Sequence, residues 1–259
     1  MIQLVLLNLG IIAIIAVAIF LLKKFVIKSE KGVKILFIVA AVLTIACHYS
    51  SLIYHAIDST NGNSYDFLTS NPNLILPIYP CNVVMWCCLI YALVDKNTKF
   101  ARFLADYIFL FGSISALVGM FANVDFINNP SLADYDVTKG IVAHGFMLFN
   151  IMIIPFFGRF KLNFISNIIH IAISILMMFI VGLYCNLIFW VLSGESTAQN
   201  VNSMFILHSP FEGVKFLTYP FIAGIALVGY FIILCVANII VHRKDKKYWW
   251  TQFKHQSEN

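Results

Sequence analysis

The residues of this sequence that could do chemistry are a thiol and a histidine set in apolar surroundings. Cys81 follows two closely spaced prolines, Pro77 and Pro80, inside a run that is otherwise largely hydrophobic. A cysteine becomes a nucleophile when a neighbouring base takes its proton, and His144 is the candidate base. If a helix begins at Pro77, Cys81 lies within its first turn or so, near the positive end of the helix dipole, which favours a thiolate.

Other polar side chains in apolar runs extend this candidate site. Tyr79 and Asn82 flank the cysteine, and each could donate a hydrogen bond to an oxyanion that forms on a substrate carbonyl. His48 is a second candidate base or a substrate-binding residue, and Asn186 and Asn202 are further candidates for substrate binding. Polar groups inside membrane segments are often functional, because an unpaired polar group in hydrocarbon costs several kcal/mol.

Structural roles compete with these assignments. A lone cysteine in a membrane helix is most often a small apolar filler, and a histidine can simply hydrogen-bond a neighbouring helix. His48, Cys81 and His144 are chemically able to bind a metal, but no two of them have the i, i+4 spacing of a ligand pair on one helix. We therefore expect no metal site and no cofactor.

The composition of the chain is that of a membrane protein. Of its 259 residues, 61% are hydrophobic and 11% are charged, whereas soluble domains carry roughly 25% charged residues. The net charge of +5 does not indicate nucleic-acid binding, because the basic residues fall in short loops between apolar runs. The six cysteines lie in or beside apolar runs without a CxxC pair, so we expect no disulfide framework.

Seven apolar runs predict an all-α, polytopic membrane bundle that forms a single transmembrane domain over residues 1–259. The predicted spans are about 2–22, 33–57, 74–94, 100–122, 139–157, 163–192 and 216–241, and a basic and aromatic tail follows at 242–259. With seven spans, fifteen of the 17 basic residues fall on one side, and only Lys139 and Lys215 remain for the other. The positive-inside rule then places the N-terminus outside and the C-terminus in the cytoplasm of a cell-membrane protein.

This orientation puts candidate residues of four spans at a similar depth. The residues predicted to lie in the exterior half of their spans are His48, Tyr79, Cys81, Asn82, His144 and Asn186. A shared depth allows these side chains to face one another but does not establish that they do.

The segment from Leu76 to Cys81 reads Leu-Pro-Ile-Tyr-Pro-Cys. It resembles the motif Leu-Pro-Leu-His-Leu-Cys that opens a span in the YwaF-like family of bacterial integral membrane proteins, and eukaryotic transmembrane protein 164 is similar to that family. The family also has a histidine at the head of a later span, which Ala143-His144-Gly145 matches. Its Asn-Tyr-Met-x-Leu segment, followed by a proline, has its nearest match in Asn202 to Ile206 with Pro210 beyond. The resemblance covers about residues 70–240.

The eukaryotic relative implies acyl transfer between phospholipids, with the motif cysteine as the acyl carrier. Carried over by position, the resemblance implies that Cys81 is this carrier and that His144 is its partner. This sequence departs from the motif at two positions, since Tyr79 stands where the family has histidine and Pro80 precedes the cysteine. If that histidine is a base in the family, this protein must use another base or lacks the activity.

Three kinds of function remain open on the sequence alone. The first is a lipid acyltransferase or acyl hydrolase that works in the exterior leaflet and has membrane lipids as its partners. The second is a transporter or solute-binding membrane subunit, in which the polar side chains bind a substrate and the prolines break a helix. The third is a structural or accessory subunit, in which these side chains only tie helices together. The sequence indicates no nucleic-acid partner and identifies no protein partner.

Overall fold

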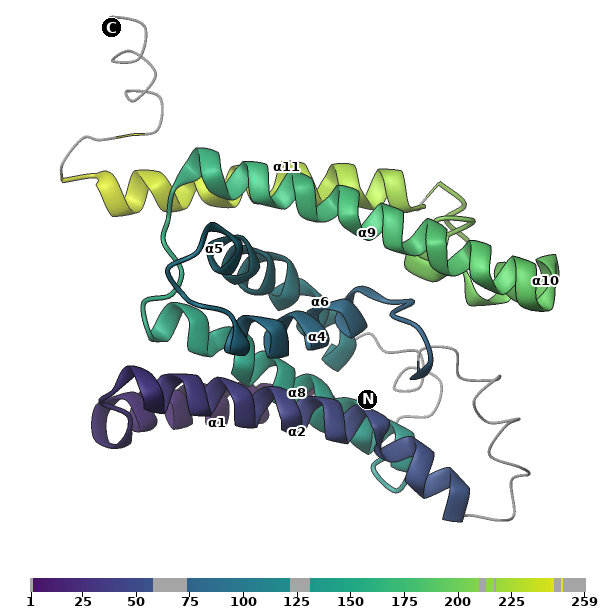
Figure 1. The fold of residues 1–259 in the computed structure, drawn as a ribbon, viewed down its shortest axis with the longest axis horizontal. Coiled ribbons are helices and arrows are strands. Elements are labelled where there is room, and N and C mark those ends of the chain that lie inside the picture. The colour runs from purple at the N-terminus through teal and green to yellow at the C-terminus, as the bar shows by residue number, and fades with distance from the viewer. Residues whose placement is uncertain are drawn as a thin grey trace, which may run out of the picture. The chain divides into compact units, whose positions relative to one another are not determined.

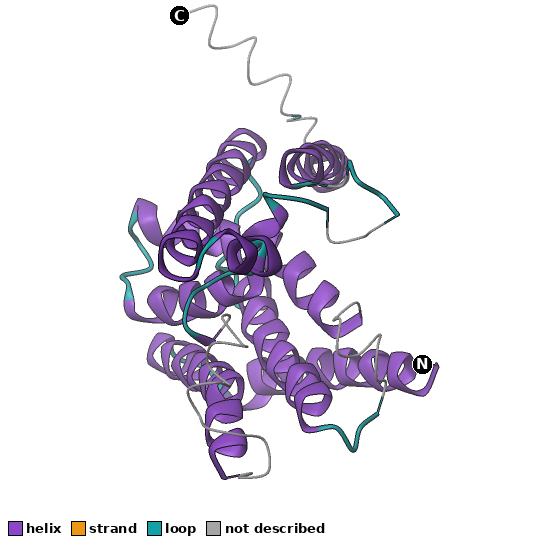
Figure 2. Cartoon of the chain, turned by 90° about the vertical axis from the view of Figure 1, so that its right-hand side faces the viewer, coloured by secondary structure: helices purple, strands orange, loops and turns teal. Residues whose placement is uncertain are grey.

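The computed structural model describes residues 2–57, 74–121, 131–209, 213–216, 218–244 and 248. Within these ranges the chain is helical and contains no strand (Figure 2), which confirms the predicted all-α class. Pro210 and most of the tail at 242–259 lie outside the described residues.

In the described part of the chain, six helical segments are long and apolar enough to cross a membrane. They are α1 (Ile2–Leu21) continued by η1 (Leu22–Val26); α2 (Glu30–Ile57); α5 (Lys99–Asp106), η4 (Tyr107–Phe111) and α6 (Gly112–Phe121) in succession; α8 (Tyr135–Phe156); α9 (Phe164–Ser193); and α11 (Tyr219–His242). Many large hydrophobic side chains on these helices are exposed, for example Ile14 at 68% and Ile240 at 60%. Such surfaces suit lipid rather than water, as expected of a multi-pass membrane protein.

The third predicted span differs from the others. Its helix, α4 (Pro80–Leu93), has 14 residues and is therefore about 21 Å long, against roughly 30 Å for a hydrocarbon core. Residues 74–79 do not continue this helix, and Tyr79 has an extended backbone (φ −118°, ψ 154°), as expected before a proline. The helix thus begins at Pro80 and not at Pro77. The count of seven spans and the orientation of the termini stay predictions.

The chain forms two compact units, residues 1–160 and residues 161–259, and the single transmembrane domain stays a prediction. In the first unit α2 packs along both α8 and α4, while α1 and α6 also pack on α8 (Figure 1). The starts of α1 and α8 lie together, because Leu4 forms a buried cluster with Val137 and Ile141.

Basic residues gather at the opposite end of the first unit. Glu30, at the start of α2, pairs with Lys96 at 2.9 Å and with Arg159, which follows α8. Lys23, after α1, donates a hydrogen bond to the carbonyl of Phe156 at the end of α8. Successive helices of the unit therefore alternate in direction, and the basic loops meet at one end, as the charge pattern predicts.

Two glycines let α6 approach its neighbours closely. A Cβ on Gly112 would lie 2.9 Å from a side-chain carbon of Val84 in α4 and 3.3 Å from one of Ile151 in α8. A Cβ on Gly119 would overlap Nε2 of His144 in α8. Small residues at such contacts allow the close packing that holds membrane helices together.

In the second unit α9 and α11 run side by side, and α10 (Glu195–Val201) packs against the end of α9 (Figure 1). A 3₁₀ turn, η5 (Ser203–Phe205), follows α10 and packs on α9 at Gly182, where a Cβ would lie 2.8 Å from Met204. Asn202 has a left-handed backbone (φ 41°) that reverses the chain between α10 and this turn.

The imidazole of His208 closes the turn after α10. Its Nδ1 lies 3.0 Å from the carbonyl oxygen of Ser209, and its Nε2 lies 2.9 Å from that of Gln199. A carbonyl oxygen only accepts, so both ring nitrogens can donate only when the imidazole is protonated. The carbonyls of Ser209 and Gln199 therefore raise the pKa of His208 above its usual value of 6.5.

We expect Gly119→Ala to destabilise the first unit. The added methyl would overlap the ring of His144, whose Nδ1 is held 2.7 Å from the carbonyl oxygen of Gly140, so the ring or α6 has to shift. Overpacking of this kind costs about 1–3 kcal/mol. The thermal-unfolding midpoint in detergent should therefore fall below that of Gly10→Ala, a helical position with nothing within 4 Å of the new methyl. Equal midpoints for the two variants would contradict the packing described.

Protonation of His208 is expected to stabilise the turn after α10. Because the pKa is raised in the folded protein, this contribution is complete below pH 6.5 and is lost as the pH rises through the folded pKa. Protection of the amides of Asn202 to His208 from hydrogen exchange, corrected for intrinsic rates, should thus decrease above pH 6.5 in the wild type. His208→Gln should lack this decrease, and a parallel pH dependence in both proteins would show that the imidazolium does not hold the turn.

Candidate functional site

Cys81 is the second residue of α4 and directly follows Pro80. Proline suits the first helical position, because its ring presets φ and its missing N–H would have no helical partner there. Asn82, the third residue, is buried, and its Oδ1 accepts a hydrogen bond from the backbone N–H of Tyr79 at 3.1 Å. The local sequence therefore fixes the cysteine in the first turn of a helix, with Tyr79 and Asn82 beside it.

The surroundings of the Cys81 sulfur act on the thiol in two opposite ways. The side chain of Cys81 is partly buried, and burial in apolar surroundings opposes ionisation of the thiol. Oriented N–H groups at a helix start stabilise both a thiolate and an oxyanion formed next to it. The two other cysteines of the helix, Cys87 and Cys88, lie beyond its first turn.

His144 is held in one orientation in α8. Its Nδ1 lies 2.7 Å from the carbonyl oxygen of Gly140, so Nδ1 carries the proton of the neutral ring. Its Nε2 faces Gly119 of α6 and keeps the lone pair that a general base needs. The close approach of α6 to α8 therefore positions a candidate base.

The structure brings Cys81 and His144 into one bundle. Helices α4, α6 and α8 converge where Gly112 meets Val84 and Ile151. Cys81 precedes Val84 by three residues, or about 4.5 Å along α4, and His144 precedes Ile151 by seven residues, or about 10.5 Å along α8. Both residues therefore lie on the side of this contact that is away from the basic end. Among the described residues, no hydrogen bond joins the thiol to the imidazole. The two groups are thus neighbours in depth but not a formed pair.

His48 lies in α2, which packs against both α4 and α8. Its ring meets that of Tyr49 edge-on, with 5.0 Å between the centroids. The preceding residue, Cys47, donates from its sulfur to the carbonyl oxygen of Lys139 at 3.7 Å, which ties this part of α2 to α8. His48 therefore belongs to the same unit as the two catalytic candidates, and its role in binding a substrate stays a prediction.

Asn186 and Asn202 belong to the second unit, where both amides bind the backbone. Asn186 accepts from the N–H of Ser203 at 2.8 Å and donates to its carbonyl at 3.2 Å. Asn202 accepts from the N–H of Leu207 at 3.0 Å and donates to the carbonyl of His208 at 2.8 Å. These amides hold the turn after α10, and their part in substrate binding stays a prediction.

Sequence reasoning missed a charged cluster where α2 ends and α8 begins. Oδ1 of Asp136 accepts from Lys139 at 2.9 Å and from Ser51 at 3.2 Å, and Oδ2 lies 3.0 Å from Nε2 of His55. Lys139 also donates to Ser51 at 2.6 Å. The sequence signal for this cluster is Lys139, one of two basic residues on the predicted exterior side. Asp136 precedes it by three positions on the same helix.

Comparison with known proteins supports the resemblance drawn from the motif around Cys81. The model of the TMEM164 family matches residues 2–250, which is nearly the whole chain. No curated protein and no solved structure matches significantly. Taken with its apolar helices of spanning length, this match shows that the chain is a multi-pass membrane protein that belongs to the TMEM164 family.

Proposed function

We propose that this protein is a thiol-dependent lipid acyltransferase or acyl hydrolase in which Cys81 carries the acyl group. The observation that carries the proposal is the position of Cys81 in the first turn of α4, at the positive end of the helix dipole and inside an apolar helical unit. The motif resemblance adds support, because it implies acyl transfer between phospholipids. On the positive-inside argument, the reaction belongs to the exterior leaflet of the cell membrane.

In the first step the Cys81 thiolate attacks the carbonyl carbon of a phospholipid ester. The S–C bond forms, the C–O bond to the glycerol oxygen breaks, and the lysophospholipid leaves with the proton that the thiol gave up. In the second step a hydroxyl of another lysophospholipid, or water, attacks the thioester, and its proton returns to the sulfur as the C–S bond breaks. The acceptor decides between transfer and hydrolysis.

His144 is the proton carrier in this proposal. The Nδ1 bond to Gly140 fixes the ring, and Nε2 is the basic atom. Since the imidazole does not bond the thiol directly, the proton passes through one water or a substrate hydroxyl. Tyr79, at the position of the motif histidine, donates its phenol to the oxyanion together with first-turn N–H groups of α4, while His48 and Asn82 contact the substrate.

Transfer of a labelled acyl chain to the protein tests the role of Cys81. The purified chain is placed in nanodiscs that contain phospholipid with a radiolabelled acyl group. We expect the wild type to acquire a label that neutral hydroxylamine removes, as a thioester requires, and Cys81→Ala to lose it. Cys87→Ala, which changes a partly buried cysteine of the same helix, should retain the label. An unlabelled wild type, or equal labelling of Cys81→Ala, would refute the proposal.

The same assay tests His144 as the base. His144→Gln keeps a polar side chain of similar size, and it should slow acyl loading about 10²–10⁴-fold, the usual contribution of general base catalysis. The loading rate should also lose the part of its pH dependence that comes from protonation of this imidazole. Unchanged loading with an unchanged pH profile would exclude Nε2 of His144 as the proton acceptor.

A further inference from the structure

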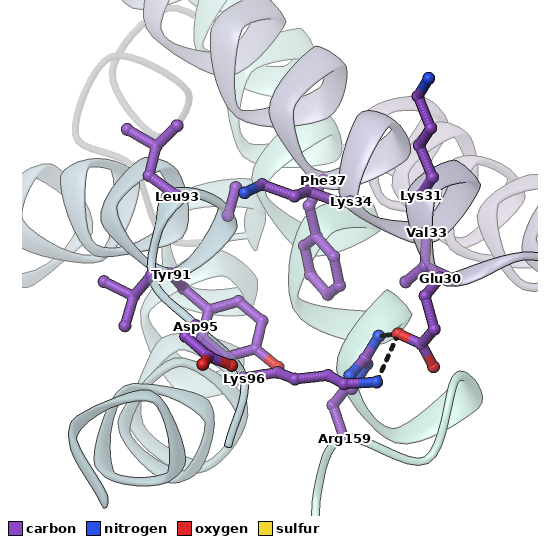
Figure 3. Close-up of a pocket in the computed structure, with 12 residues that line it drawn as sticks. Glu30, Lys31, Val33, Lys34, Phe37, Tyr91, Leu93, Asp95, Lys96 and Arg159 are labelled. Carbon is purple, nitrogen blue, oxygen red and sulfur yellow. Dashed lines mark hydrogen bonds and ion pairs between the residues drawn. The ribbon is translucent and has the colours of Figure 1, made fainter. Parts of the chain in front are cut away.

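A cavity of about 460 Å³ lies at the basic end of the first unit, between the start of α2, the end of α4 and Arg159 after α8 (Figure 3). Its volume falls within the range of small-molecule sites, roughly 300–1,000 Å³. Cys81 precedes Leu93, the last residue of α4, by twelve residues, or about 18 Å along the helix. The cavity is therefore separate from the thiol site and needs its own explanation.

The walls of the cavity carry more positive than negative charge. Four basic and two acidic residues line it: Lys31, Lys34, Lys96 and Arg159, with Glu30 and Asp95. Lys96 and Arg159 converge on the same carboxylate oxygen, Oε2 of Glu30 (Figure 3), with 2.9 Å between Lys96 Nζ and this oxygen. Two cations that meet at one anionic oxygen form a position that a phosphate oxygen would also satisfy. Glu30 thus marks an anion-binding position within the cavity.

Lys34 supplies a further cation. Its side chain extends from α2 across the cavity toward α4, whereas Lys31 points away (Figure 3). Lys34 is exposed, and among the described residues it forms no hydrogen bond or ion pair. An anion that binds Lys96 and Arg159 would therefore also interact with the uncompensated positive charge of Lys34 on the opposite wall.

The floor of the cavity is apolar. Phe37 and Tyr91 are buried there and meet edge to face, with 5.1 Å between their ring centroids, and the exposed Leu93 lies at the rim. A small soluble anion gains little from such a lining, whereas a lipid can place its glycerol and first methylene groups against it. Because α2 begins and α4 ends beside the cavity, it lies at the level of the headgroups, on the end that the charge pattern assigns to the cytoplasm.

We propose that this basic pocket, formed by Lys34, Lys96 and Arg159 over a floor of Phe37 and Tyr91, binds the headgroup of an anionic phospholipid from the adjacent leaflet. The lipid phosphate replaces Glu30 as the partner of Lys96 and Arg159, and Lys34 closes over it. Glu30 acts as an internal competitor that holds the pocket when no lipid is bound. The site does not depend on the acyl chemistry proposed for Cys81.

Native mass spectrometry of the full chain in detergent, titrated with phosphatidylglycerol, tests this assignment. We expect the first phosphatidylglycerol to bind the wild type at least tenfold more tightly than phosphatidylcholine. Lys34→Gln should weaken this binding about fivefold, as one surface cation contributes toward an anionic lipid. Glu30→Gln should strengthen it, because Lys96 and Arg159 lose their internal partner. That gain is the sharpest expectation, since no general loss of structure could produce it.

Lys99→Gln is the matched control, because Lys99 lies at the same basic end but does not line the pocket. Its binding should equal that of the wild type, and equal weakening by Lys34→Gln and Lys99→Gln would reduce the effect to general surface charge and overturn the proposal. Soluble glycerol phosphate that displaced the lipid at matched concentration would assign the pocket to a free phosphate compound and overturn the lipid assignment. Cys81→Ala should bind the lipid normally, so this result and the acyl-labelling result can fail independently.

Discussion

The start of α4 meets a constraint on which both the fold and the proposed chemistry depend. Inside an apolar bundle every backbone N–H needs a partner, yet the first turn of a helix supplies none from within the helix. Pro80 removes one of these donors, and Asn82 satisfies the N–H of Tyr79. Cys81 lies in this first turn, directly after Pro80. The capping of α4 therefore places the thiol at a helix start, where a negative charge can be stabilised.

The first unit is held differently at its ends and in its middle. At one end Glu30 joins Lys96 and Arg159, and at the other Asp136 joins Lys139 and His55. Partly exposed ion pairs of this kind contribute little stability, typically about 0–1 kcal/mol each. Between the two ends, packing depends on close approach at glycines of α6. The basic end also contains a cavity, which charged and apolar side chains line together.

Hydropathy predicted most of the helices, but it did not predict how the residues of the candidate site are arranged. The predicted runs at 2–22, 33–57, 100–122, 139–157, 163–192 and 216–241 each largely coincide with a helix of spanning length. The run at 74–94 contains a shorter one, since hydropathy registers apolar side chains and not the backbone donors that proline removes. Asn186 shows a similar limit of sequence analysis. An asparagine in an apolar run is expected to have a hydrogen-bond partner, but the sequence does not reveal that this partner is the backbone of Ser203.

By itself the sequence determined the membrane class, the all-α fold, the positions of the long helices and the family, because bilayer thickness, loop charge and a short motif act on each segment separately. Only the tertiary structure decided that Nε2 of His144 faces α6 and that Glu30, Lys96 and Arg159 line one cavity. Those facts depend on which face of each helix meets which neighbour. In helices that are apolar on nearly every side, the sequence contains no amphipathic pattern from which that choice could be read.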